Sequence, residues 1–249
     1  MVRFGRIPPL VTPTPTLQVA ADADVLAWDV ACFIATRIAD ATERFGLSLS
    51  GGSTPKRIYE LLGAGNLGIS LDWREVHVFW GDERFVPMDH PDSNFRMVRE
   101  AMLDRIAIPP SQVHPILTGG TPEEAAALYA KTLQSFYGST LLDPQRPLFE
   151  LTLLGLGEDG HTASLFPGTE ALEEREVWVT SVIGAKPEPR ISLTYPALES
   201  SRDILFVVSG AKKRDILSRV LANDMRLPAA RIATGGTIHV FADRAALPR

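Results

Sequence analysis

Two side chains that can exchange protons stand two residues apart near the middle of the chain. Asp159 and His161 follow an apolar run of strand character, Leu151–Leu154, and a turn that is rich in glycine. A carboxylate and an imidazole presented at the end of a strand are suited to acid-base chemistry. The segment therefore has the layout of an active-site turn.

The glycines of this turn also match a nucleotide-binding pattern. Residues 155–160 read Gly-x-Gly-x-x-Gly after a strand, which is the dinucleotide fingerprint. In such a site Glu158 and Asp159 would place two negative charges beside a pyrophosphate. Pro167 and Gly168 also come too soon for the long helix that a dinucleotide site needs. The sequence favours an active-site turn over a nucleotide site. The alternative is a purely structural tight turn in which the Asp and the His are solvated.

The segment Ser50–Pro55 has the composition of a phosphate-binding turn. Gly51 and Gly52 offer backbone N–H groups without side-chain obstruction, and Ser53 and Thr54 add hydroxyls at the positive end of a predicted helix. The spacing Gly-x-x-x-x-Gly-Lys is absent, so a nucleoside triphosphate is not implied. An ordinary strand-to-helix turn is the alternative.

Two cations are candidates for holding the same anion. Lys213 lies just inside a helix that follows a buried strand, where a positive charge is unfavourable unless an anion lies beside it. Arg190, at the start of a predicted strand, is the second candidate. Lys212 and Lys213 could instead form a solvated helix start, as most charge pairs do.

A third group of charged residues follows Trp80. Asp82, Glu83 and Arg84 place two carboxylates and a guanidinium at a strand end. Either carboxylate could position Arg84 and leave the N–H groups of its guanidinium free for a substrate oxygen or a phosphate. A simple loop ion pair is the alternative.

The sequence lacks the side-chain patterns of a metal site, a serine triad and a reactive cysteine. His77, His90, His114 and His239 are scattered without partners at metal-ligand spacing, so we predict no metal and no cofactor. No Gly-x-Ser-x-Gly motif is present, which argues against a serine triad. The single cysteine, Cys32, has no sequence neighbour that would depress its pKa.

The candidate groups follow the ends of four predicted strands, after Ser50, Trp80, Leu154 and Ser209. Strands alternate with helices along the chain, which predicts a single-domain α/β fold, Rossmann-like, with a mostly parallel open sheet and helices on both faces. Ligands bind at the carboxyl ends of the strands in such sheets. We therefore expect the four loops to share one crevice.

Some element boundaries can be predicted as well. Apolar spacing predicts a helix over 24–45 and a shorter one over 56–62 that ends before Gly63. Thr121 begins a capping box and a helix to about Tyr137. Strand character also appears at 113–117, 177–183 and 190–194. Residues 1–16, which include four prolines, are expected to be a loose leader, and 17–249 the domain.

Bulk properties restrict the partners. The chain has 249 residues, 45% of them hydrophobic and 22% charged, with a net charge of -5 and a pI near 5.6. This balance argues against nucleic acid or an anionic membrane as the main partner. No apolar run is long enough to span a membrane. One cysteine allows no intrachain disulfide, so a cytoplasmic setting is expected.

Four motifs together resemble the glucosamine-6-phosphate isomerase/6-phosphogluconolactonase family, and within it the 6-phosphogluconolactonases. The motifs occur in the family's order over essentially 17–241, and they read Ser50-Gly-Gly-Ser-Thr-Pro55, Trp80-Gly-Asp-Glu-Arg84, Gly155-Leu-Gly-Glu-Asp-Gly-His-Thr-Ala-Ser-Leu-Phe-Pro167 and Ser209-Gly-Ala-Lys-Lys213. Arg190-Ile-Ser-Leu-Thr194 matches a further family stretch. The resemblance implies hydrolysis of a small phosphosugar lactone, 6-phospho-D-glucono-1,5-lactone, to 6-phosphogluconate in the oxidative pentose phosphate pathway.

The related glucosamine-6-phosphate deaminases supply a contrast. Their corresponding loop reads Asp-Gly-His-Ile-Ala-Phe-Asn-Glu-Pro, and its glutamate assists the histidine in opening the sugar ring. Phe166 stands at that glutamate's position here, although Asp82 matches the deaminases' proton-abstracting aspartate. The resemblance thus favours a lactonase. A deaminase or isomerase and a catalytically silent sugar-phosphate sensor are the alternatives.

The resemblance and the residue chemistry lead to one mechanistic hypothesis. His161 takes a proton from the water that attacks C1, and Asp159 orients its ring. Backbone N–H groups of the glycine turn or Arg84 meet the oxyanion. The 6-phosphate is held by residues 50–54, Arg190 and Lys213. Arg214 departs from the small residue that relatives often have after the lysine, so Lys212 and Lys213 both remain candidates.

Overall fold

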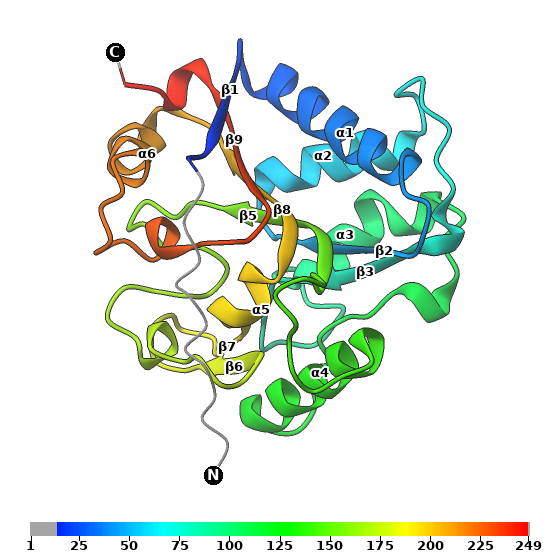
Figure 1. Ribbon diagram of the computed structural model, residues 1–249, viewed down its shortest axis with the longest axis vertical. Coiled ribbons are helices and arrows are strands. Elements are labelled where there is room, and N and C mark those ends of the chain that lie inside the picture. The colour runs from blue at the N-terminus through cyan, green and yellow to red at the C-terminus, as the bar shows by residue number, and fades with distance from the viewer. Residues whose placement is uncertain (1–13, 249) are drawn as a thin grey trace.

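A six-stranded parallel sheet forms the centre of the computed structural model, which describes residues 14–248 (Figure 1). Its strand order is β1-β9-β8-β5-β2-β3. Every neighbouring pair in this sheet runs parallel. The strands are β1 (Thr16–Ala20), β2 (Phe45–Leu49), β3 (Val76–Trp80), β5 (Phe149–Gly155), β8 (Ser201–Val208) and β9 (Thr237–Asp243). The predicted α/β class with a mostly parallel sheet is confirmed.

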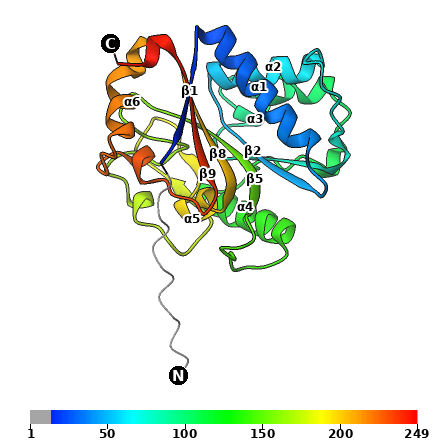
Figure 2. The ribbon, with the colours of Figure 1, turned by 45° about the horizontal axis from the view of Figure 1, so that its top comes forward.

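Helices cover both faces of this sheet. Figure 2 shows α1, α2 and α3 on one side of it and α6 on the other. The helices are α1 (Ala23–Ala39), α2 (Ser53–Ala64), α3 (Asn94–Ala101), α4 (Pro122–Tyr137), α5 (Tyr195–Glu199) and α6 (Arg214–Leu221). Because both faces are covered, successive residues of the central strands are buried: Leu151, Thr152, Leu153 and Leu154 of β5 are all buried.

A second, antiparallel sheet was not predicted. It consists of β4 (Asp82–Arg84), β7 (Arg190–Leu193) and β6 (Val179–Val182), in that order, and α4 packs against β6 and β7. Gly81 joins the two sheets, because its N–H donates to Leu49 O at 2.8 Å and its carbonyl accepts from Leu193 N–H at 2.9 Å. Asp82, Glu83 and Arg84 thus lie on a strand, where the sequence indicated a loop.

Other boundaries also differ from expectation. The first helix ends at Ala39, not near residue 45, because Phe45 already pairs with Val76 in the large sheet. Gly63 lies inside α2, which ends at Ala64 and has Gly65, with a φ of 66°, as its C-cap. Residues 113–117 form no strand beyond a bridge from Val113 to Val78. The capping box at Thr121 is confirmed.

Residues 1–13 of the predicted leader lie outside the described residues, and Thr16 already belongs to β1. The division into a leader and a domain stays a prediction. Among residues 14–248, no helix is both long and apolar enough to cross a bilayer. The same residues contain no group of three or more His, Cys, Asp or Glu side chains that could hold a metal ion.

Candidate active site

A cavity of about 240 Å³ lies where the four predicted loops meet, at the carboxyl ends of the central strands. Of the predicted site residues, six line it and four do not: Ser53, Thr54, Asp159 and Arg190 lie outside its wall. The lining residues are Ser50, Gly51, Gly52, Asp82, Arg84, Asn94, Gly155, Leu156, Gly157, His161, Ala163 and Lys213. The shared crevice expected from strand order therefore exists.

His161 and Asp159 form a hydrogen-bonded pair at one wall of this cavity. The Nδ1 atom of His161 lies 2.5 Å from Asp159 Oδ1, and the same oxygen accepts the His161 backbone N–H at 3.1 Å. Burial raises the pKa of the Asp159 carboxyl, but the hydrogen bonds from His161 outweigh burial, and the pKa lies below its usual value. A carboxylate at this place can accept a proton from Nδ1, and in that tautomer of the imidazole Nε2 carries the lone pair.

The glycine turn makes room for this pair. A Cβ atom at Gly157 would overlap the ring of His161 and come within 2.6 Å of Asp159 Oδ1. Gly160 has a φ of 84°, and its N–H donates to Gly157 O at 3.0 Å, which closes the turn. Two of the three glycines are therefore required by the position of His161 and not by a nucleotide.

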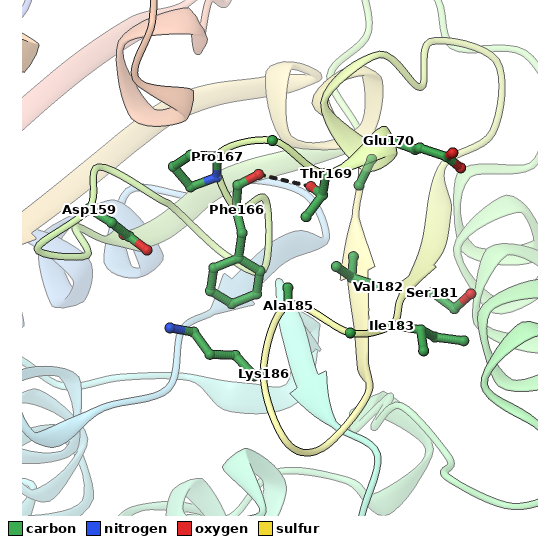
Figure 3. Close-up of a pocket in the computed structure, with 13 residues that line it drawn as sticks. Asp159, Phe166, Pro167, Thr169, Glu170, Ser181, Val182, Ile183, Ala185 and Lys186 are labelled. Atoms are coloured by element: carbon green, nitrogen blue, oxygen red, sulfur yellow. Dashed lines mark hydrogen bonds between the residues drawn. The ribbon is translucent and has the colours of Figure 1, made fainter.

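Phe166 packs against His161 and lines a larger cleft of about 840 Å³ that Asp159 also lines. The ring centroids of His161 and Phe166 lie 4.6 Å apart. On the cleft side, Lys186 of the β6–β7 connection places its Nζ 5.0 Å from the Phe166 centroid (Figure 3). An apolar ring thus lies beside the pair of His161 and Asp159, at the position that matches the glutamate of the deaminase motif.

The N-terminus of α2 faces the cavity with unused backbone donors. Gly52, with a φ of 111°, is its N-cap, and no side chain caps the helix. The first-turn N–H groups have no partner within a helix, which makes this end attractive to an anion. Ser53 lines an adjoining cavity of about 340 Å³ that shares Gly52, Arg84 and Asn94 with the first.

Arg84 and Arg190 lie side by side near the cavity. They are register partners in the antiparallel pair of β4 and β7. Burial, together with the charge of Arg84, lowers the pKa of the Arg190 guanidinium, and its buried Nη1 has no hydrogen-bond partner among the described residues. Arg84 donates from Nη1 to Asp92 O at 2.6 Å. Two adjacent guanidiniums with unused donors form an environment suited to an oxyanion.

The two carboxylates beside Arg84 have different roles. Glu83 is buried and accepts four hydrogen bonds, from Ser93 Oγ and from the backbone N–H groups of Arg84, Asn94 and Phe95. It caps the N-terminus of α3 and does not line the cavity. Asp82 does line it, and its Oδ2 accepts from Ser164 Oγ at 2.6 Å.

Asn94 and Ser164 are site residues that the sequence did not reveal. Asn94 donates from Nδ2 to Asp82 O at 2.9 Å, and a Cβ atom at Gly51 would overlap its side chain. Asn94 is the first residue of α3. Its approach to Gly51 depends on how α3 docks, which the local pattern does not contain.

Of the two candidate lysines, only Lys213 lies at the cavity. Lys213 lines the cavity, whereas Lys212 is exposed and does not. Arg214 turns away, donating to Leu247 O at 2.9 Å and Ala245 O at 3.1 Å. The loop itself is held by Asp243, which accepts from Ser209 Oγ and Gly210 N–H.

Comparisons with known proteins show the family of the chain. A family model described as glucosamine-6-phosphate isomerases/6-phosphogluconolactonase matches residues 21–240. The chain belongs to this family. A 6-phosphogluconolactonase from Nostoc sp. is 41% identical over 239 residues, covering 93% of this chain and 96% of the relative. The resemblance drawn from the four motifs is confirmed.

Solved structures of the family have the same fold. The 6-phosphogluconolactonase from Trypanosoma brucei has a TM-score of 0.77 and 31% identity, covering 93% of this chain and 97% of that one. A monomeric glucosamine-6-phosphate deaminase also has a TM-score of 0.77, at 20% identity. Because a lactonase and a deaminase share the fold, the fold by itself does not distinguish the two activities.

Proposed function

We propose that this chain hydrolyses 6-phospho-D-glucono-1,5-lactone to 6-phospho-D-gluconate. The observation that carries the proposal is His161, whose Nδ1 is held by Asp159 at 2.5 Å in the wall of a cavity that Lys213 and Arg84 also line. A neutral imidazole held in this way has a free Nε2 that can accept a proton from water. The relatives named 6-phosphogluconolactonase support this substrate.

In the proposed reaction, water attacks the lactone carbonyl at C1 while His161 Nε2 takes its proton. The tetrahedral oxyanion then collapses, the bond from C1 to the ring oxygen breaks, and His161 returns the proton to that oxygen. Asp159, ionised throughout, stabilises the imidazolium between the two steps. No covalent enzyme intermediate is needed because a lactone is an activated ester.

Arg84 is the better candidate for meeting the oxyanion. The N–H of Gly157 already donates to His161 O at 2.8 Å, and that of Gly160 donates to Gly157 O at 3.0 Å. These two donors of the turn are therefore occupied, whereas Arg84 lines the cavity with guanidinium donors beyond the one given to Asp92. Preorganised positive charge at this place lowers the barrier as negative charge develops.

The 6-phosphate is assigned to the N-terminus of α2 and to two further cations of the site. The uncapped N-terminus of α2, with Gly51, Gly52, Ser53 and Thr54, offers backbone and hydroxyl donors. Lys213 and Arg190 supply the countercharge. Anchoring the phosphate there would fix the position of C1 relative to His161. Fixing a reacting atom in this way lowers the entropic part of the activation barrier. Asp82, held by Ser164, is placed to accept from a sugar hydroxyl.

The decisive experiment adds purified protein to freshly generated lactone and follows acid release against the spontaneous rate. We expect catalysis above the background that His161→Ala abolishes and that an excess of EDTA leaves unchanged. A parallel sample of glucosamine 6-phosphate should release no ammonia. Ammonia release without lactone hydrolysis would establish a deaminase, and tight binding of 6-phosphogluconate without any turnover would establish a sensor.

A further inference from the structure

A second cavity lies at the opposite end of the large sheet. It has a volume of about 380 Å³, and its wall is largely apolar, with Leu142, Pro144, Pro147 and Pro196 among the lining residues. Ser201, which begins β8, also lines it, whereas the lactone cavity lies beyond the other end of that strand. Eight strand residues separate the two ends, which is about 26 Å.

One carboxylate in this wall has unused hydrogen-bonding capacity. Glu199, the last residue of α5, lines the cavity and accepts a single hydrogen bond, from the backbone N–H of Ala233 at 3.2 Å. A carboxylate can accept about four. Within residues 14–248, no Lys, Arg or His lies within ion-pair distance of it. The nearby Arg175 instead donates to Leu172 O and Glu174 O and stacks on Tyr195.

Three charged residues line the cavity, and of these we expect Glu199 to select the ligand. Asp143 is exposed, and its Oδ1 is used by the Gln145 N–H at 2.9 Å. Arg202 is exposed at the rim. An apolar cavity of this size with one convergent acceptor is the usual form of a small-molecule site.

We propose that the Glu199 cavity binds a small, planar organic cation that donates paired N–H groups, such as an amidinium or a protonated aminoheterocycle. The flat, apolar ring of such a ligand packs between the proline side chains, and its two N–H groups meet the two oxygens of Glu199. This site is separate from the lactone cavity and does not depend on the proposed reaction.

The protonation of Glu199 makes the site sensitive to pH. Burial raises the pKa of Glu199 to about 7, against smaller opposing effects of the Ala233 N–H and Arg175. Tyr195, Arg175, Asp143 and Arg202 are the other charged or titratable groups around it. Burial raises the pKa of the Tyr195 phenol, which therefore stays protonated at pH 5.5 and at pH 8.5. A cation should therefore bind well at pH 8.5 and poorly at pH 5.5.

The test uses benzamidine, with the neutral isostere benzamide as control. Calorimetric titration at pH 8.5 should give a Kd for benzamidine at least about tenfold lower than for benzamide, and this difference should vanish at pH 5.5. In the wild-type protein, benzamidine should shift the NMR amide signals of Gly235 and Gly236, which line the cavity. Saturating 6-phosphogluconate should not displace it.

A substitution isolates the carboxylate. Glu199→Gln keeps an oxygen for the Ala233 N–H, so the fold should be retained while the preference for benzamidine over benzamide disappears. Glu43→Gln, at an exposed position outside the cavity, should leave the preference for benzamidine over benzamide unchanged. Equal binding of both compounds to the wild type, benzamidine shifts elsewhere than the cavity, or a preference that survives Glu199→Gln would each overturn the proposal.

Discussion

Arg84 lies directly opposite Arg190 in the antiparallel pairing of β4 with β7. Like charges in register across two strands destabilise a sheet, by roughly 0.2–1 kcal/mol. Here the cost coincides with a cavity that is proposed to bind a phosphosugar. Under the proposed function, a bound phosphate would offset this repulsion, so the arrangement would favour the complex over the empty protein.

This relationship leads to the first prediction. Arg190→Gln should raise the free energy of unfolding of the empty protein by about 0.5 kcal/mol, because the repulsion is removed. It should also lose most of the stabilisation that 6-phosphogluconate gives the wild type in thermal unfolding. Arg99→Gln, whose guanidinium lies 3.8 Å from Asp104 away from the cavity, serves as control. A destabilised variant that still responds fully to ligand would contradict the proposed role.

The second prediction concerns the division of labour within the site. His161→Ala should lower kcat by roughly 10²–10⁴ with little change in 6-phosphogluconate binding, since it removes the base. Lys213→Ala should mainly weaken binding, by about tenfold to a hundredfold, because it removes a charged contact to phosphate. Steady-state kinetics and calorimetry measure both. Equal effects of the two substitutions on kcat and on binding would argue against separate roles.

The third prediction tests the space around the catalytic pair. Gly157→Ala should lower kcat about a hundredfold, because its methyl group would displace the His161 ring and a shift of about 1 Å is that costly. Ligand binding should change little. Gly119→Ala is a matched control, since a Cβ atom there meets nothing within 4 Å. Normal turnover in Gly157→Ala would show that the observed position of His161 is not the catalytic one.

A fourth prediction concerns a histidine pair remote from the site. His77 Nδ1 and His114 Nε2 lie 3.1 Å apart, and burial, with the neighbouring His77, lowers the pKa of His114 to about 4. The unfolded chain, with an ordinary pKa near 6.5, then binds the proton more readily than the folded protein does. Stability contributed by His114 is complete above about pH 6.5 and is lost as the pH falls toward 4.

Urea unfolding at pH 7.5 and pH 4.5 measures this loss. His114→Gln should reduce the decrease by about 1–2 kcal/mol, a figure discounted because the ring is only partly buried. His90→Gln, at a loop histidine outside the pair, should leave the decrease in the free energy of unfolding the same as in the wild type. An unchanged decrease in His114→Gln would show that other groups control acid unfolding.

The predicted chemistry of the site depended on short segments, and these could be interpreted without a structure. The carboxylate-imidazole pair, the glycine turn and the uncapped helix start are each set by residues within a dozen positions of one another. Local backbone geometry decides such features, because glycine permits positive φ and the first helical N–H groups have no partner in the helix. The four motifs also placed the chain in its family.

Contacts between distant segments were settled only by the tertiary structure. Glu83 could not be separated from Asp82 until α3 docked on it, and Lys213 could not be separated from Lys212 until the loop after β8 was placed. The pairing of Arg84 with Arg190 and the Asn94 approach to Gly51 depend on strand register and helix packing. The chain's own pattern of apolar and polar residues specifies which elements form. How those elements meet is decided by the packing of the whole core, because each side chain's environment is made by residues far away in sequence.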